Sequence, residues 1–195
     1  MMNEIISQIA KGCYIHSIKH SDYWANKEFV LNAIEHDSEF YKFASLELQN
    51  DKDVVLKVVE TNGHYIQSIP NDLKYDRDVI RASLKTSIKG IDFISKEMKK
   101  DIKFYVELMK INPYVYISSS IIIKNNREIA LELSSSIGGY FSYFPTKFRD
   151  DKEIVLNNVR NHGLSLKHVS ERLRKDEYVI TTAVNNNKNA IDYAL

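Results

Sequence analysis

Residues 51–63, DKDVVLKVVETNG, and residues 151–163, DKEIVLNNVRNHG, carry nearly the same text one hundred residues apart. A shorter period of 25 residues is also present, because every twenty-fifth residue from Asn26 onward is Asp or Asn. These repeat starts are Asn26, Asp51, Asp76, Asp101, Asn126, Asp151 and Asp176. Because an internal period decides the architecture before any single element does, we predict a tandem array of seven repeats, the last of which ends at Leu195.

The first half of each repeat has the pattern of a capped helix. Asp or Asn at position 1 suits a helix N-cap, and an acid at position 3 meets the positive end of the helix. Positions 4, 5, 8 and 9 are mostly apolar, as in Val54, Val55, Val58 and Val59. Side chains with this spacing share one helical face, so the pattern predicts a helix that is buried along that face.

The second half of each repeat predicts a shorter helix. Gly63, Gly138 and Gly163 stand at position 13, where a left-handed cap would end the first helix. Positions 16 and 19 are largely apolar, and position 20 is Ser or Pro, which favours a chain reversal or the start of a last helical turn. Position 23 is always apolar and is predicted to fill the seam before the next cap.

Such a hairpin cannot bury its apolar faces alone, but stacked neighbours can. We therefore predict an all-α fold, an α-solenoid of about seven helical-hairpin repeats that forms a single domain over residues 1–195. Residues 1–25 follow the spacing only roughly and are predicted to be a degenerate capping unit.

The pattern is clearest in residues 151–176, DKEIVLNNVRNHGLSLKHVSERLRKD. It resembles the tandem repeats called domain of unknown function 4116, and the resemblance covers residues 26–195. What the resemblance implies is a helical repeat without established catalytic residues. The middle of the chain departs from the pattern, because Lys103 replaces the acid at position 3 and Tyr105 replaces a valine.

The bulk composition excludes several classes of protein. No stretch approaches the roughly 20 apolar residues that span a membrane, and the N-terminus lacks the pattern of a secretion signal, so we predict a cytoplasmic protein without a membrane partner. A single cysteine excludes an intrachain disulfide framework. The net charge of +1 removes the strongest argument for a polyanionic partner.

No pattern of catalytic residues is evident. The acidic residues recur with the repeat, as caps do, and no phosphate-binding glycine loop or nucleophile elbow occurs, so we predict a non-enzymatic protein without a cofactor. Cys13, His16 and His20 would share a helical face and are zinc ligands by type. Because no second cysteine supports a site, we predict no metal there.

Aromatic residues are numerous, with twelve Tyr, eight Phe and one Trp, and several stand at variable positions. Rigid aromatic side chains are frequent anchors in protein interfaces. Residues 114–148 depart furthest from the repeat and are predicted to carry the partner-binding surface. The candidate residues are Tyr114, Tyr116, Tyr140, Phe141, Tyr143 and Phe148.

Two further functions compete with protein binding. Position 24 is mostly basic, and a stacked ridge of such residues could follow a nucleic-acid backbone. The ridge comprises Lys74, Lys99, Lys124, Arg149 and Arg174. The acids of positions 1 and 3 share this edge with the basic residues of position 2, which favours local ion pairs instead. A scaffold or oligomerisation module is the other alternative.

The preferred interpretation is a monomeric or weakly self-associating protein that binds another protein. Its expected role is that of a steric inhibitor or antagonist, of the immunity or anti-defence type.

Overall fold

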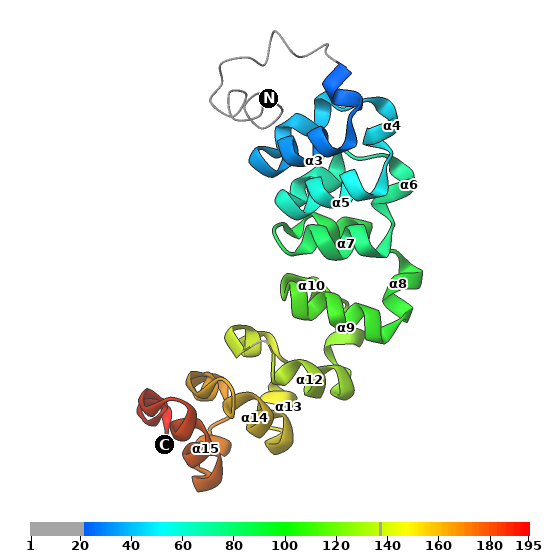
Figure 1. Cartoon of the computed structure of the whole chain (residues 1–195). Coiled ribbons are helices and arrows are strands. Elements are labelled where there is room, and N and C mark those ends of the chain that lie inside the picture. Colours follow the sequence, from blue (N-terminus) through cyan, green and yellow to red (C-terminus); the bar gives the residue numbers. More distant parts are fainter. Residues whose placement is uncertain (1–21, 137) are drawn as a thin grey trace. The chain divides into compact units, whose positions relative to one another are not determined.

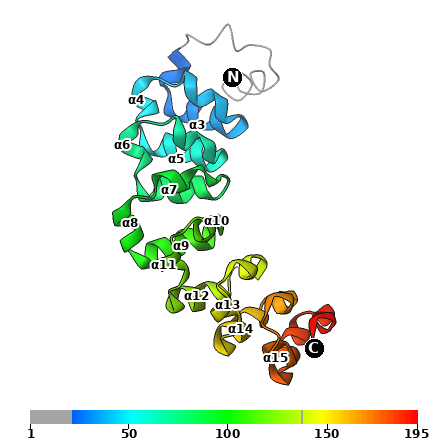
Figure 2. The same cartoon turned by 180° about the vertical axis from the view of Figure 1, so that it is seen from behind.

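The computed structural model describes residues 22–136 and 138–195. Helices and turns fill these residues, and no β-strand occurs within them (Figures 1 and 2). They form two compact units, with the boundary between Lys99 and Lys100. The boundary lies beside the repeat start at Asp101, so each unit is built of consecutive repeats. The predicted all-α solenoid of 25-residue repeats is confirmed, whereas the single domain over residues 1–195 stays a prediction.

Unit 1, the part through Lys99, contains three α-helices that start its repeats and pack side by side. They are α3 (Lys27–His36), α5 (Lys52–Thr61) and α7 (Arg77–Leu84). The shorter segments are η1 (Asp22–Ala25), η2 (Ser38–Phe43), α4 (Leu46–Gln49), η3 (Gly63–Gln67), α6 (Asn71–Lys74), η4 (Ile88–Phe93) and α8 (Lys96–Lys100).

Unit 2, the part from Lys100 onward, repeats this arrangement with four such helices, each packed on the next. They are α9 (Ile102–Ile111), α12 (Arg127–Ser134), α14 (Lys152–Val159) and α15 (Glu177–Asn186). The shorter segments are α10 (Tyr114–Ile117), α11 (Ile121–Lys124), η5 (Gly138–Tyr143), α13 (Thr146–Arg149), η6 (Gly163–His168), η7 (Leu173–Lys175) and η8 (Lys188–Tyr193).

The caps and core positions predicted from the period are confirmed. The Asp51 carboxylate accepts from the backbone N–H groups of Asp53 and Val54, and the side chain of each of the other six repeat starts accepts from one or two backbone N–H groups in the first turn of its own helix. The valines at positions 4, 5, 8 and 9 of α5 are completely buried. Burying such a side chain stabilises the fold by about 1.5–3 kcal/mol, so the shared positions supply most of the packing energy.

The second half of each repeat differs from the predicted single helix. Six of the seven repeats place a 3₁₀ helix there, and the exception is α10. A third, shorter helix then begins near position 20, as Ser and Pro indicated. Ser45, for example, caps α4 by accepting from the backbone N–H of Leu48. Position-23 side chains are buried or half-buried beneath these short helices.

The prediction of left-handed glycine caps is wrong, because none of these glycines has a positive φ. They begin the 3₁₀ segments, and glycine is needed there because the following repeat approaches closely. A Cβ on Gly63 would lie 2.1 Å from the carbonyl oxygen of Ser83, and one on Gly163 would lie 2.3 Å from that of Ala183. The Gly63 N–H also donates to Thr86 Oγ1 of the following repeat at 2.8 Å.

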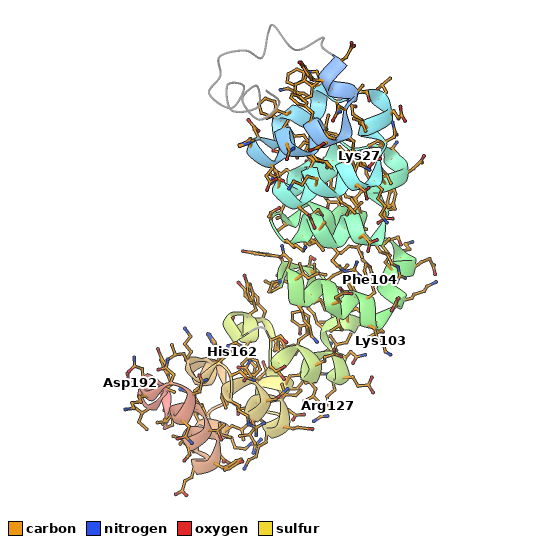
Figure 3. All side chains as sticks on the ribbon, in the orientation of Figure 1. Lys27, Lys103, Phe104, Arg127, His162 and Asp192 are labelled. Carbon is orange, nitrogen blue, oxygen red and sulfur yellow. The ribbon has the colours of Figure 1, made fainter. Side chains whose placement is uncertain are left out.

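Ion pairs join neighbouring repeats within each unit, as the alternating signs predicted. Lys27 Nζ lies 2.8 Å from Asp51 and 2.7 Å from Asp53. Lys52 binds Asp76 and Asp78 in the same way, and in unit 2 the same bridges run from Arg127 to Asp151 and Glu153 and from Lys152 to Asp176. Figure 3 labels Lys27 and Arg127, the cations of two of these bridges. Ile102 takes the place of the cation in its own repeat, so this bridge is missing there.

Candidate partner-binding surface

Three tyrosines of unit 2 form an accessible cluster, which we call the tyrosine cluster. Tyr114 comes from α10, while Tyr140 and Tyr143 come from η5. The Tyr140 ring centroid lies 6.0 Å from that of Tyr114 and 6.1 Å from that of Tyr143. Tyr114 is 49% exposed and Tyr143 is 54% exposed, whereas Tyr140 is half-buried between them. Mutual ring contacts of this kind hold aromatic side chains in place while their outer faces stay open.

The 3₁₀ geometry of η5 explains which aromatic residues point outward. With three residues per turn, side chains three apart share one side of the helix. Phe141 and Phe144 point into the core, where they are nearly completely buried with their ring centroids 5.2 Å apart. Tyr140 and Tyr143 share a different side and remain accessible. One short segment thus supplies both a core pair and a surface pair.

Three of the six predicted partner-binding residues belong to the core instead. Tyr116, Phe141 and Phe148 are 0%, 0% and 4% exposed. The Tyr116 ring packs against Phe144, its hydroxyl donates to the Lys124 carbonyl, and burial raises the pKa of that hydroxyl. Phe148 stands at position 23, whose apolar character indicated a buried side chain in every repeat. These three residues are therefore not accessible to a partner, while Tyr114, Tyr140 and Tyr143 stay predicted contacts.

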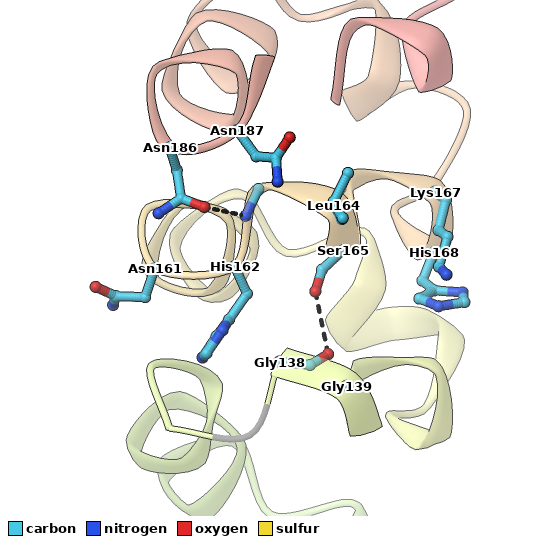
Figure 4. A pocket seen from close by; sticks show the side chains of 11 residues that line it. Gly138, Gly139, Asn161, His162, Leu164, Ser165, Lys167, His168, Asn186 and Asn187 are labelled. Atoms are coloured by element: carbon cyan, nitrogen blue, oxygen red, sulfur yellow. Dashed lines mark hydrogen bonds between the residues drawn. The ribbon is translucent and has the colours of Figure 1, made fainter. Parts of the chain in front are cut away.

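A cleft of about 340 Å³ begins at the two glycines that precede Tyr140, and we call it the polar cleft. It lies between η5, η6 and the ends of α14 and α15. Its lining comprises Gly138, Gly139, Asn161, His162, Gly163, Leu164, Ser165, Lys167, His168, Asn186 and Asn187. Figure 4 shows Asn161 and His162 on one side of the cleft and Lys167 and His168 on the other. The cleft therefore shares the η5 segment with the tyrosine cluster.

Hydrogen bonds between neighbouring repeats hold the walls of the polar cleft. The Gly163 N–H donates to Asn186 Oδ1 at 2.7 Å, and Ser165 Oγ donates to the Gly138 carbonyl at 3.1 Å. His162 packs so closely that a Cβ on Gly138 would lie 2.0 Å from its Cγ. These contacts within the chain hold the residues that line the cleft in place.

The lining residues of the polar cleft include a lysine and two histidines but no acid. Lys167 forms no ion pair with any of the residues that the structure describes. Burial, together with the positive charges of Lys167 and Arg149, holds the pKa of His168 below its ordinary value. The lowered pKa favours the neutral form of His168, and Lys167 is the one Lys or Arg among the lining residues.

Our sequence interpretation did not select these cleft residues. His168 stands at position 18, the variable position that also provides Tyr143, but nothing in one repeat shows that a cleft opens beside it. The lack of an ion pair at Lys167 is only weakly indicated by the sequence, in that no acid occurs at positions 11–18 of its own repeat.

Two arginines of the basic ridge at position 24 form hydrogen bonds within unit 2. Arg149 donates to the carbonyls of Phe144 and His168, and Arg174 donates to the carbonyl of Tyr193. These bonds tie each arginine to the backbone of the next repeat. In unit 1, the Lys74 ammonium lies 5.9 Å from the centroid of the Phe93 ring, and Lys99 is exposed. Lys124 of unit 2 is half-buried.

No group of three His, Cys, Asp or Glu side chains with the geometry of a metal site occurs among residues 22–136 and 138–195. Cys13, His16 and His20 lie outside the described residues, as does most of the predicted capping unit, residues 1–25. No described helix is both long enough and apolar enough to cross a membrane.

The family described as "Domain of unknown function (DUF4116)" matches residues 26–74, 51–99, 126–174 and 151–195. Together these matches cover residues 26–99 and 126–195, well over half of the chain, and each begins at a repeat start. None of the four segments includes residues 100–125, the repeat that carries Ile102 and Lys103. No match was found among curated proteins or among solved structures.

Proposed function

We propose that this chain, which belongs to the DUF4116 family of helical repeats, is a non-enzymatic protein that binds another protein. The binding surface is the tyrosine cluster of unit 2. The observation that carries this proposal is the group of three mutually packed tyrosines, two of which expose about half of their surface. Such side chains provide contact area at low entropic cost, because packing already restricts them.

The proposed mechanism is steric. Helix caps, core valines and bridges between repeats make each unit rigid before it meets a partner. A preorganised surface covers a partner with little loss of conformational freedom, so it can block a site on that partner without chemistry. We therefore propose a cytoplasmic inhibitor or antagonist of the immunity or anti-defence type, monomeric or weakly self-associating.

Nucleic-acid binding through position 24 is the competing function, and one observation disfavours it. Binding to a phosphate backbone depends on cations that are free to replace its counterions. Arg149 and Arg174 instead donate to backbone carbonyls of their own unit. The position-2 cations of four repeats are likewise engaged, because Lys27, Lys52, Arg127 and Lys152 bridge to neighbouring acids.

The proposal is tested by affinity capture from the native cell with the full chain as bait, followed by quantitative mass spectrometry. The bait is compared with the double variant Tyr140→Ala/Tyr143→Ala. Tyr178→Ala is the matched control, because Tyr178 is also an exposed tyrosine of unit 2, at 59%, but stands outside the cluster. We expect one protein that is enriched on the unchanged chain and the control, and is lost on the double variant.

Circular dichroism of each bait establishes that it is folded. Equal enrichment on all three baits would contradict the proposed surface. Recovery of nucleic acid that disappears when Lys74, Lys99 and Lys124 are changed to Glu would support the competing function.

A further inference from the structure

The polar cleft holds a positive charge that forms no ion pair within the described part of the chain. Lys167 lies in its wall, and no Asp or Glu is among the lining residues. An ammonium group is a donor with no acceptor atom, and a carboxylate, which only accepts, is its natural complement.

A comparable cleft in unit 1 has its charges balanced internally. It has a volume of about 530 Å³ and is lined by residues of η2 and η3 together with Gln49, Asn62 and Ser68. Glu39 Oε2 accepts from Lys42 Nζ at 2.8 Å, and Glu39 Oε1 accepts from the Tyr65 hydroxyl at 2.7 Å. The lysine of unit 1 therefore has an ion-pair partner within its own cleft, whereas Lys167 forms no ion pair with the residues that the structure describes.

An apolar surface adjoins the polar cleft. Gly138 and Gly139 line the cleft, and Tyr140 follows them directly in η5. Tyr143 and His168 stand at the same repeat position on η5 and η6, which pack against each other. Leu164, another lining residue, is 41% exposed. A ligand that spans both features therefore needs an acidic group beside an apolar one.

We infer that the partner presents an acidic segment to this surface, with an Asp or Glu side chain in the polar cleft and an adjacent apolar residue on the tyrosine cluster. The carboxylate accepts from Lys167 Nζ. The neighbouring apolar or aromatic side chain packs on the outer faces of Tyr140 and Tyr143. This inference rests on the proposed function, because it assigns a chemistry to the partner of the same surface.

A peptide fits this surface better than a nucleic acid does. A phosphate backbone carries a charge on every nucleotide and is bound by rows of cations. The polar cleft offers a single lysine, and the nearby Arg149 is already bonded to the carbonyls of Phe144 and His168. One cation beside an aromatic cluster matches one carboxylate beside one apolar side chain.

The test uses the full chain and a random 12-residue peptide library displayed on phage. Selection on the unchanged chain is expected to enrich peptides with an Asp or Glu next to an aromatic or aliphatic residue. Synthetic, fluorescein-labelled copies are then titrated by fluorescence anisotropy. Lys167→Glu is expected to weaken their binding about tenfold, because it places like charges together at the contact.

Lys175→Glu is the matched control, since Lys175 is an exposed lysine of unit 2 outside the cleft. This control is expected to bind the peptides as tightly as the unchanged chain. A labelled oligothymidylate of similar length, titrated in parallel, is expected to bind more weakly than the peptides.

Each of four results would overturn the inference: no enriched sequence, enriched sequences without an acid, equal affinity for the Lys167→Glu variant, or tighter binding of the oligothymidylate. Failure here is distinguishable from failure of the proposed function. Capture of the cellular partner could depend on Tyr140 and Tyr143 but not on Lys167. That result would support the tyrosine cluster as the binding surface and refute the acidic segment of the partner.

Discussion

The two clefts of this molecule lie in comparable places in the repeat but differ in charge. In unit 1, positions 14 and 17 of one repeat are Glu39 and Lys42, which bind each other. In unit 2, the same positions of a lining repeat are Leu164 and Lys167, so the lysine has no acid three residues before it. The backbone around both clefts follows the same sequence of α-helix, 3₁₀ helix and short helix.

This difference shows that some positions of the repeat build the fold and others vary at the surface. Positions 1, 4, 5, 8 and 9 are alike in the two units because they cap, fill and pack the helices. Positions 14, 15, 17 and 18 vary because the fold does not depend on them. A surface for recognition can therefore arise in one unit without a change in the scaffold.

The largest effect is expected where a scaffold side chain is removed from the segment that carries the tyrosine cluster. Phe141→Ala deletes a completely buried ring, and such changes lower the free energy of unfolding by about 3–5 kcal/mol. Tyr143→Ala removes a ring from the exposed side of the same segment and should change stability by less than about 0.5 kcal/mol. Urea unfolding followed by circular dichroism measures both. Equal losses for the two variants would refute the division of η5 into a core side and a binding side.

The next effect concerns the glycines at the start of the 3₁₀ segments. In Gly63→Ala the new methyl group meets the Ser83 carbonyl, so the backbone must shift, and we expect a loss of about 3 kcal/mol. Gly139→Ala is the control, because nothing lies within 4 Å of its Cβ position. Thermal unfolding should show a lower midpoint for Gly63→Ala alone. If both variants melt together with the unchanged chain, close approach does not explain the glycine at position 13.

The third effect concerns a substitution that makes the polar cleft of unit 2 resemble the cleft of unit 1. Leu164→Glu places an acid three residues before Lys167, the spacing of Glu39 and Lys42, and should reduce the affinity for acidic peptides about tenfold. Stability should change little, because Leu164 is partly exposed. Glu39→Gln in unit 1 is the matched variant and should leave peptide affinity as it was. Fluorescence anisotropy gives both affinities. An unchanged peptide affinity for Leu164→Glu would mean that Lys167 does not take part in peptide binding.

The smallest effect belongs to the bridges that both units share. The hydrogen bond from Lys27 holds the pKa of Asp51 below its ordinary value, and Arg127 does the same for Asp151. A lowered pKa in the folded state stabilises the protein above the unfolded value, about 3.9, and this contribution disappears as the pH falls through the folded value.

Asp51→Asn keeps a capping oxygen but removes the charge, so it should destabilise the chain slightly at pH 7 and less at about pH 2. Urea midpoints at the two pH values test this. A loss that is the same at both values would mean that the capping hydrogen bonds, and not the ion pair, were changed.

Much of the scaffold followed from the period alone, because its causes lie within 25 residues. The Asp and Asn caps and the buried positions 4, 5, 8 and 9 are local properties of an amphipathic helix, so repetition was enough to reveal them. The role of Gly63 was not visible in this way. Its cause is the Ser83 carbonyl of the next repeat, which only the packed structure places nearby.

The surface was only half predictable for a related reason. Whether the second segment winds with 3.0 or 3.6 residues per turn decides which aromatic residues face inward, and the pattern did not distinguish the two. Phe141 and Tyr143 were therefore grouped together although they lie on different sides of η5. The unbalanced charge of Lys167 depends on what three successive repeats bring to one cleft, and it could be recognised only in three dimensions.

The most direct test of the central claim is hydrogen–deuterium exchange of the full chain with and without the protein that it captures. We predict slower exchange in residues 114–118, 138–143 and 163–168 of the bound chain, with no change in α3, α5 or the cleft of unit 1. Protection confined to unit 1 or to the segments that carry Lys74 and Lys99, with none around Tyr140 and Lys167, would contradict the account.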